Sequence, residues 1–431
     1  MEKIKGVLVG RSSTRGFMTN IRMLSLIGIY LVIFIDNLGA SLIIPMLTPI
    51  AHDPAAGLIS EGSESFRNGV YGVALGAFSI AMFFGAPLLG ALSDGLGRKK
   101  TLLLCLGGLA MSYVFLALAL AFKSLWLFMA GRLIGGFFSG SLPVAQASII
   151  DVTEEKLRAK YIGYIMFFVS LGYVVGPLIG GYLSDPALVP WFNLQTPFVF
   201  VAALSVVNLL ILLLVFQDQQ ADADGRGMTL PNPIANLLDA VRIKDIRTYA
   251  LLLLLMLVGW NTFFQFIGLY LTGELGLGQQ EVSSFVSWVG FGLASAFLFL
   301  VGVAMKMLKP LGMVGVALAL MALCIGGTLI STNVYALYLL AALGAVGFGL
   351  SYSGLMAQLS MSVDASRQGS IMGMAAAIAA FSAGFSGFAF GFVANISVSA
   401  PILSALLCVC LAILVCCKEQ MSLARQVKYA D

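Results

Sequence analysis

Two ionisable side chains lie inside long apolar runs of the sequence. Asp36 falls in the run near residues 24–48, and Arg132 falls in the run near residues 125–150. A carboxylate near the centre of a bilayer costs about 2.5 to 3.5 kcal/mol on insertion scales, so Asp36 needs a functional reason to be there. Hydrocarbon disfavours the charged form of a carboxylate and a nearby cation favours it, so a group balanced in this way can load and release a proton. The alternative is a cavity aspartate that only aids solvation.

Arg132 keeps its charge at any working pH, because a guanidinium is a very strong base. Inside a span it therefore has to bind backbone carbonyls, water or a carboxylate. We expect Arg132 to tune the protonation of Asp36 and not to carry a proton itself. The alternative is a structural arginine that bonds a broken helix nearby.

A short polar segment separates the second and third apolar runs. It reads Gly90-Ala91-Leu92-Ser93-Asp94-Gly95-Leu96-Gly97-Arg98-Lys99 and is followed by Lys100. We expect a short loop here. With Asp151 and Arg158, near the facing ends of the fourth and fifth runs, Asp94 and Arg98 are candidates for an ionic latch between helices. An exposed ion pair contributes at most ~1 kcal/mol, so such a latch would bias a conformational equilibrium and not hold the fold.

The fifth apolar run, near residues 159–184, combines glycines with an internal proline. It contains Gly172-Tyr173-Val174-Val175-Gly176-Pro177-Leu178-Ile179-Gly180-Gly181. Glycines let membrane helices approach closely, and a proline cannot donate a backbone hydrogen bond. We therefore expect this helix to pack tightly and to bend locally. The alternative is that these residues only reflect the ordinary composition of membrane helices.

Polar and aromatic residues inside the predicted spans one, four, seven and ten are candidate substrate contacts. They are Asn37, Gln146, Trp260, Asn261, Phe264, Gln265, Tyr352 and Gln358. Hydrocarbon does not satisfy amides, so we expect a central cavity lined by aromatic rings, a few amides and one carboxylate. Such a cavity suits an amphipathic organic molecule, neutral or cationic.

The composition places all these residues in a membrane protein. The 431 residues are 60% apolar and 10% charged, which is more apolar than a soluble protein of this length can hide in its core. About 20 apolar residues are long enough to cross ~30 Å of hydrocarbon. We predict twelve such spans, near residues 24–48, 69–92, 101–122, 125–150, 159–184, 196–216, 248–272, 282–305, 310–331, 334–359, 368–394 and 399–417.

The distribution of positive charge predicts the orientation of the spans. If both termini are cytoplasmic, Arg67 and Lys123 fall outside and Arg132 falls within a span, while the rest of the 24 Lys and Arg lie on cytoplasmic segments. The basic N-terminus precedes an apolar run that is long and has no small-residue cleavage site, so we keep it as the first span and not as a signal peptide. The single histidine, His52, is expected to be solvated in the first outer loop. The six cysteines have no metal-ligand spacing and are expected to be packing residues.

The chain divides into two halves of six spans. We predict a basic cytoplasmic N-terminus at 1–23, an N-terminal bundle at 24–216, a cytoplasmic linker at 217–247, a C-terminal bundle at 248–417 and a cytoplasmic tail at 418–431. The second part of the linker is expected to form a short helix on the membrane surface. The halves echo each other at an offset of about 210 residues, as expected of a transporter built from repeats.

Four of these segments resemble motifs of the major facilitator superfamily. Residues 90–100 are similar to its cytoplasmic loop motif, and residues 131–140, around Arg132, to its fourth-span arginine motif. The run Asp36-Asn37-Leu38-Gly39-Ala40-Ser41-Leu42-Ile43-Ile44-Pro45 resembles the first-span signature of proton-driven drug exporters, including tetracycline efflux proteins. Residues 172–181 look like the antiporter motif that separates drug:proton antiporters from the sugar and metabolite transporters of the superfamily.

The resemblance implies an all-helical fold of two six-helix bundles, related by an axis along the membrane normal, that rock around a central cavity. It implies that Asp36 and Arg132 take part in proton coupling. It also implies a latch that locks the outward-facing state, formed by Gly90, Asp94, Gly97, Arg98, Asp151 and Arg158. The antiporter motif would be carried by Gly172, Gly176, Pro177, Gly180 and Gly181.

We therefore predict a secondary active transporter of the bacterial inner membrane, a proton-coupled antiporter that exports a drug-like or natural-product molecule as a monomer. The expected partners are the substrate, the proton and the lipid bilayer. We expect no cofactor besides the coupling proton, no metal and no nucleic acid. The sequence contains no nucleotide-binding loop, so we also expect neither a primary pump nor an enzyme. The alternatives are a proton-driven uptake carrier for a small metabolite or siderophore, and a non-transporting membrane receptor or scaffold.

Overall fold

The structure, a computed structural model, describes the chain with a few gaps. The backbone is described for residues 2–55, 57–152, 155–215, 246–363 and 368–430, and for a few residues between 232 and 242. Side chains are described for residues 26–55, 57–149, 161, 163–214, 246–363 and 371–422, and for the same few residues between 232 and 242. Most of the predicted linker and its surface helix therefore lie outside the described residues.

Helices make up the secondary structure of these ranges. The first half contains α1 (Glu2–His52), α2 (Glu64–Leu96), α3 (Arg98–Ala121), α4 (Leu125–Phe138), α5 (Ser141–Val152), α6 (Glu155–Tyr182) and α7 (Thr196–Val215). The second half contains α9 (Arg247–Gly273), α10 (Gln279–Ser295), the π-helix η1 (Ala296–Leu300), α11 (Val301–Met307), α12 (Pro310–Ile330), α13 (Val334–Met361), α14 (Gln368–Val393) and α15 (Ala400–Ala430).

The described residues contain 12 helical spans that are long and apolar enough to cross a membrane. The predicted number of spans and the all-helical fold class are thereby confirmed. Helices are the expected solution, because each backbone amide in hydrocarbon must be bonded within its own segment. Polar residues mark where several of them begin: the side chains of Ser63, Ser124 and Asn333 accept hydrogen bonds from the first turns of α2, α4 and α13.

Two local features differ from the expectations. The polar segment at residues 90–100 is almost entirely helical, since α2 continues to Leu96 and α3 begins at Arg98. Gly97 alone joins them with φ of 93°, a conformation that glycine adopts without strain. The fourth span is not one continuous helix either, because it is interrupted between Phe138 and Ser141.

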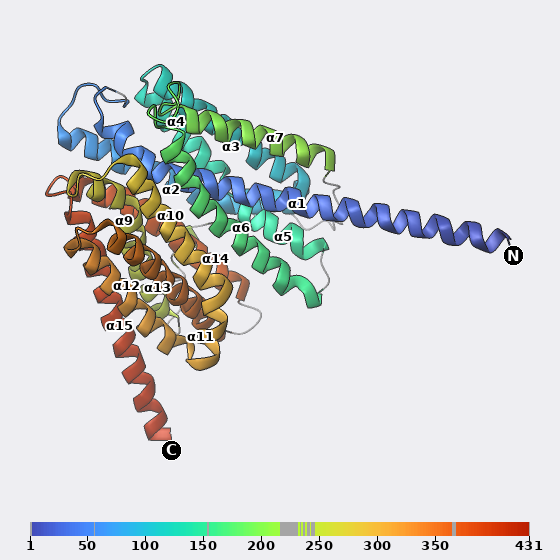
Figure 1. Ribbon diagram of the computed structural model, residues 1–431. Coiled ribbons are helices and arrows are strands. Elements are labelled where there is room, and N and C mark those ends of the chain that lie inside the picture. The colour runs from blue at the N-terminus through green and yellow to red at the C-terminus, as the bar shows by residue number, and fades with distance from the viewer. Residues whose placement is uncertain are drawn as a thin grey trace.

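The helices form two bundles that converge at one end of the molecule (Figure 1). Helices α1 to α7 form the first bundle and α9 to α15 form the second. We call the end reached by the two termini the terminal face and the opposite end the distal face. The bundles meet near the distal face and diverge toward the terminal face, where α1 and α15 run off in different directions (Figure 1).

Two glycine-rich seams join the bundles. Along α2 and α14, a Cβ on Gly72 would lie 2.6 Å from the Gly387 carbonyl oxygen, and a Cβ on Gly387 would lie 2.5 Å from the backbone nitrogen of Gly76. Along α6 and α10, a Cβ on Gly290 would lie 2.6 Å from the backbone of Tyr173. Any larger side chain at these positions would hold the helices apart, so glycine permits backbone contact between the bundles.

Hydrogen bonds reinforce the contact between the bundles near the distal face. The Asn68 amide donates to Asn395 Oδ1 at 3.1 Å, and the Tyr71 hydroxyl donates to the Gln265 carbonyl at 2.7 Å. His52 is the last residue of α1, and its Nε2 lies 3.0 Å from Asn68 Oδ1. The expectation of a solvated loop histidine is therefore wrong, because α1 extends far enough to bring the ring into this contact.

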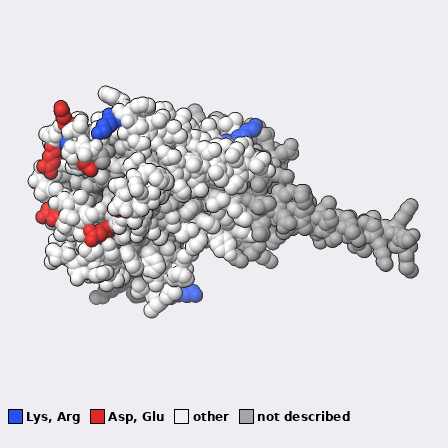
Figure 2. All heavy atoms as spheres, turned by 45° about the horizontal axis from the view of Figure 1, so that its top comes forward, with Lys and Arg blue, Asp and Glu red and all other residues white. Residues whose placement is uncertain are grey.

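The two faces differ in charge (Figure 2). Acidic side chains gather at the end of the molecule that lies at left in Figures 1 and 2, which is the distal face. The described carboxylates there are Asp53, Glu61, Glu64, Asp185, Glu274 and Glu281, and the described cations are Arg67 and Lys123. Toward the terminal face the described side chains include Arg98, Lys99, Lys100, Arg247, Lys306, Lys309 and Lys418.

The seam between α2 and α14 leads to a testable prediction. We expect Gly387→Leu to wedge these helices apart, because the added side chain would meet the backbone of Gly76. Spin labels at the exposed residues Phe66 on α2 and Phe392 on α14 should then show a longer distance distribution in double electron–electron resonance. Gly312→Leu is the control, since a Cβ there meets nothing within 4 Å. An unchanged distance in the Gly387 variant would contradict the role of the seam.

Candidate functional site

Asp36 lies in the middle of the membrane-spanning part of α1 and is only 6% exposed. Its Oδ2 accepts a hydrogen bond of 2.5 Å from the hydroxyl of Ser141. Ser141 is fully buried and is the first residue of α5. A buried carboxylate therefore has a neutral donor from a helix far away in the sequence as its partner.

The break in the fourth span brings Ser141 to this position. Glycines on both helices let α4 run against α2 in backbone contact, since a Cβ on Gly136 would overlap the Phe78 carbonyl and a Cβ on Gly85 would overlap the Phe137 carbonyl. A Cβ on Gly140 would lie 2.9 Å from Ala86 Cα. The chain thus crosses α2 closely before α5 begins, and α2 fixes the place where α5 starts.

Arg132 lies on α4, is 5% exposed and turns toward α2. Its Nε donates to the Ala74 carbonyl at 2.9 Å, and its guanidinium lies 4.5 Å from the centroid of the Phe78 ring. A carbonyl and an aromatic face are both suitable partners for a buried guanidinium. In the described part of the chain Arg132 and Asp36 do not form an ion pair. The proposed tuning of Asp36 by Arg132 remains a prediction.

Tyr113 of α3 lies near both charged groups, and the sequence analysis does not single it out. Its phenol lies within electrostatic range of both Asp36 and Arg132. Its hydroxyl covers Gly39, one turn after Asp36, so closely that a Cβ on Gly39 would overlap it. A tyrosine in an apolar run gives no sequence signal that it lies near two charged groups. Gly39 is the residue that makes room for its hydroxyl.

The glycines of the predicted antiporter motif divide between two neighbours of α6. A Cβ on Gly172 would lie 2.8 Å from Asn37 Cβ, and a Cβ on Gly176 would overlap Ser41 and the Leu38 carbonyl, so both glycines face α1. Gly180 also faces α1, at Leu42, and Gly181 faces Ser283 of α10. Pro177 lies inside α6, directly after Gly176. This helix therefore packs against Asp36's helix on one side and against the second bundle on the other.

The candidate latch is described only in part. Asp94 and Arg98 form an ion pair with a distance of 2.6 Å across the α2–α3 turn, and Arg98 also donates to Ser93. A Cβ on Gly90 would meet nothing within 4 Å, whereas Gly97 is the residue that joins α2 to α3. The side chains of Asp151 and Arg158 lie outside the described residues. The latch between helices stays a prediction.

Three of the predicted aromatic contacts belong to one stack in the second bundle. The Trp260 ring lies 4.7 Å from Phe348 and 6.3 Å from Phe264, and the Phe348 ring lies 5.9 Å from Tyr352. Phe264 in turn lies 5.9 Å from Tyr173 of the first bundle. Phe348, which the sequence analysis did not single out, is the centre of this stack. Its signal was its spacing, four residues before Tyr352 on the same helix.

Most of the predicted amide contacts bind neighbouring helices. Asn261 donates to Ser382 Oγ at 3.1 Å and Gln265 donates to the Ala383 carbonyl at 3.0 Å, which joins α9 to α14. Gln358 donates to the Tyr249 hydroxyl at 3.3 Å, and Asn37 donates within its own helix to Ile33. Gln146 is half-buried on α5. Substrate contact by these amides stays a prediction.

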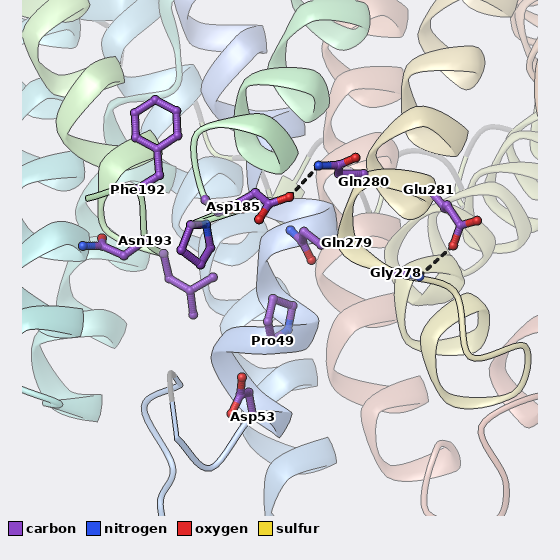
Figure 3. Close-up of a pocket in the computed structure, with 12 residues that line it drawn as sticks. Pro49, Asp53, Asp185, Phe192, Asn193, Gly278, Gln279, Gln280 and Glu281 are labelled. Atoms are coloured by element: carbon purple, nitrogen blue, oxygen red, sulfur yellow. Dashed lines mark hydrogen bonds between the residues drawn. The ribbon is translucent and has the colours of Figure 1, made fainter. Parts of the chain in front are cut away.

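A pocket of about 720 Å³ opens between the bundles at the distal face (Figure 3). Pro49 and Asp53 at the end of α1, residues 184–186 and 192–194 between α6 and α7, and the start of α10 line it. Across it Gln280 donates to Asp185 Oδ2 at 2.5 Å, so the pocket contains a further bond between the bundles (Figure 3). No sequence motif indicates this pocket, because its walls come from helix ends and a loop that lie far apart in the sequence. Within the described ranges, no group of three or more His, Cys, Asp and Glu is placed to hold a metal ion.

Comparisons with known proteins agree with this geometry. The family model described as Major Facilitator Superfamily matches residues 29–388. The class C tetracycline resistance protein of Escherichia coli is 27% identical over 356 residues, 80% of this chain and 83% of that protein. The class H tetracycline resistance protein of Pasteurella multocida is 33% identical over 196 residues, so the match covers 46% of this chain and only 45% of that protein. The crystal structure of the human organic anion transporter MFSD10 has a similar fold, with a TM-score of 0.65 at 20% identity over 91% of this chain and 99% of that one.

The contact between α6 and α1 leads to a second prediction. We expect Gly176→Leu to destabilise the protein by about 1–3 kcal/mol, because overpacking would force α6 away from the backbone of Leu38. Thermal unfolding in detergent measures the loss. Gly163→Leu on the same helix is the matched control and should change little, since a Cβ on Gly163 meets nothing within 4 Å. Equal unfolding temperatures for both variants would rule out a close contact at Gly176.

Proposed function

Since the chain belongs to the Major Facilitator Superfamily and is thus a multi-pass membrane transporter and not an enzyme, we propose that it is a proton-coupled antiporter. It exports an amphipathic drug-like or natural-product molecule by alternating access, as a monomer in the bacterial inner membrane. The coupling ion is the proton, and no other cofactor is required. Proton entry supplies the energy, at about 2.3 kcal/mol per charge and 100 mV of membrane potential.

The observation that carries this proposal is the burial of Asp36 in the middle of a span. A structural carboxylate in hydrocarbon is normally paired with a cation, because an unpaired charge there is unfavourable. Asp36 has the hydroxyl of Ser141 as its hydrogen-bond partner instead, and Arg132 is engaged with α2. A carboxyl group with a neutral partner can exist in both protonation states, which is the property that proton coupling needs.

The arrangement of the bundles supports alternating access. The hydrogen bonds and glycine contacts between the bundles described above lie in the distal halves of the helices. The excess of Lys and Arg toward the terminal face favours a cytoplasmic location for that face. With this orientation the protein is closed toward the outside and the bundles are separated toward the cytoplasm, an inward-facing state.

The aromatic stack supports an aromatic, amphipathic substrate. Trp260, Phe264, Phe348 and Tyr352 offer flat ring faces, and such faces bind planar or cationic organic groups well. The tetracycline resistance proteins among the relatives favour a drug-like molecule.

The proposal predicts that Asp36→Asn abolishes proton-coupled transport while the protein still folds and inserts. The substitution removes the titrating group, and the loss of a buried charge does not destabilise the fold. The measurement uses inverted vesicles with an acidic interior, in which accumulation of candidate aromatic compounds and release of protons are followed together. Glu274→Gln, at an exposed carboxylate beyond the distal end of α9, is the control and should transport normally.

Three outcomes would overturn the proposal. Gradient-driven transport that survives in Asp36→Asn would remove Asp36 from proton coupling. Accumulation only in right-side-out vesicles, driven inward with protons, would make the protein an uptake carrier. Saturable binding of a compound with no transport in either kind of vesicle would indicate a receptor or scaffold.

A further prediction concerns Arg132. Tyr113 lies within electrostatic range of both Arg132 and Asp36. A positive charge favours the ionised form of a nearby carboxyl group. We therefore expect Arg132→Ala to lower the transport rate and to move the pH optimum of transport upward. Arg132→Lys keeps the positive charge and should therefore keep the pH optimum. A pH profile that Arg132→Ala leaves in place would make Arg132 a structural residue.

A further inference from the structure

We propose that Ser141 is a positioning residue for proton coupling, whose hydroxyl holds the deprotonated carboxylate of Asp36 and sets the pH at which Asp36 releases its proton. The inference rests on the proposed function and adds a residue from the interrupted fourth span to it. No sequence motif indicates this role for Ser141.

The break in the fourth span is what frees this hydroxyl. Serine in a helix normally bonds the carbonyl four residues earlier in the same helix. Ser148 on α5 does so with Val144 at 2.7 Å, and Ser205 on α7 does so with Val201 at 2.8 Å. Ser141 begins α5 and has no preceding turn of that helix, so its hydroxyl reaches across to α1 and Asp36.

Both partners of this bond are shielded from water. Ser141 is fully buried and Asp36 is 6% exposed, so water does not readily replace the hydroxyl. A hydrogen bond to an ionised acceptor is shorter and roughly twice as strong as one between neutral groups. The bond therefore stabilises the ionised form of Asp36 more than the neutral form. Because a hydroxyl also accepts hydrogen bonds, Ser141 can remain bonded after Asp36 is protonated.

The other titratable groups around Asp36 do not replace this donor. Cys105 and Tyr113 of α3 and Tyr173 of α6 lie within electrostatic range of Asp36. As neutral groups they leave its charge uncompensated. Arg132 is the cation that we expect to act on Asp36. Its Nε, however, donates to the Ala74 carbonyl, and its guanidinium lies over the Phe78 ring. Among the described side chains, Ser141 is therefore the donor that Asp36 has in this state.

The test compares Ser141→Ala with Ser141→Thr. Alanine removes the hydroxyl with little change in volume, and threonine restores it. We expect Ser141→Ala to move the midpoint of Asp36 protonation to a higher pH by roughly one unit, and Ser141→Thr to stay near the unmodified protein. Ser148→Ala is the matched control, because it removes a buried hydroxyl from the same helix that bonds only its own backbone.

The midpoint is read directly from the infrared band of the protonated carboxyl group in detergent or liposomes. Asp36→Asn identifies the band, since it must disappear in that variant. The pH profile of transport is the second measurement, and its midpoint should move in the same direction. A band that titrates at the same pH in Ser141→Ala and in the unmodified protein would overturn the role of Ser141.

This outcome is distinguishable from failure of the proposed function. The infrared titration reports the Asp36–Ser141 bond whether or not protons drive transport. A shifted band in a protein without substrate-driven proton release would support the bond and contradict antiport. An unshifted band in a protein with normal proton-coupled transport would contradict only the role of Ser141. If Ser141→Ala does not fold, Ser141→Cys takes its place, because a thiol is a weaker donor than a hydroxyl. A partial upward shift of the band in Ser141→Cys supports the inference, and an unshifted band overturns it.

Discussion

A carboxylate inside a membrane span must accept from protein groups the hydrogen bonds that water would otherwise donate. At Asp36 this requirement explains how several helices of the first bundle are placed. Its partner is Ser141, and the hydroxyl of Ser141 is available only because α5 begins there. The helix can begin there only because the chain of the fourth span is interrupted after Phe138. The interruption in turn is held in place by the backbone contact between α4 and α2. The buried carboxylate of Asp36 thus joins α1 to α5, and this contact depends on how closely α4 packs against α2.

Glycine makes this arrangement possible. At Gly85, Gly136 and Gly140 a side chain would collide with the neighbouring helix, so these positions determine how α2 and α4 cross. The same device appears between α1 and α6, where Gly172 and Gly176 bring α6 within reach of Asn37 and Leu38. In a membrane, where helices gain little by burying apolar surface against each other, such close packing is a main source of attraction. The helix of Asp36 is therefore packed closely against α6.

The contacts between the bundles are of another kind. They consist of two narrow seams, α2 with α14 and α6 with α10, and of a few hydrogen bonds such as those of Asn68, Tyr71 and Gln280. Each of these bonds is between neutral groups or has one charged partner, so each is individually weak. An interface of this composition can separate without breaking either bundle, which is what alternating access requires. Helix α6 belongs to both systems, because it packs on α1 with one set of glycines and on α10 with Gly181.

The sequence alone determined the number of spans and the membrane position of Asp36 and Arg132. These are local properties, because about 20 consecutive apolar residues fix a span wherever it packs. Only the tertiary structure decided which partners the buried groups have. Asp36 and Ser141 are 105 positions apart in the chain, and their contact depends on the rotation and crossing of separate helices. The same holds for Arg132, which we expected to tune the protonation of Asp36 and which the packing of α4 turns toward Ala74 and Phe78 of α2. Hydropathy is nearly uniform around a membrane helix, so it carries little information on which face meets which neighbour, and that choice is made by close packing of glycines and by the need of each buried polar group for a partner.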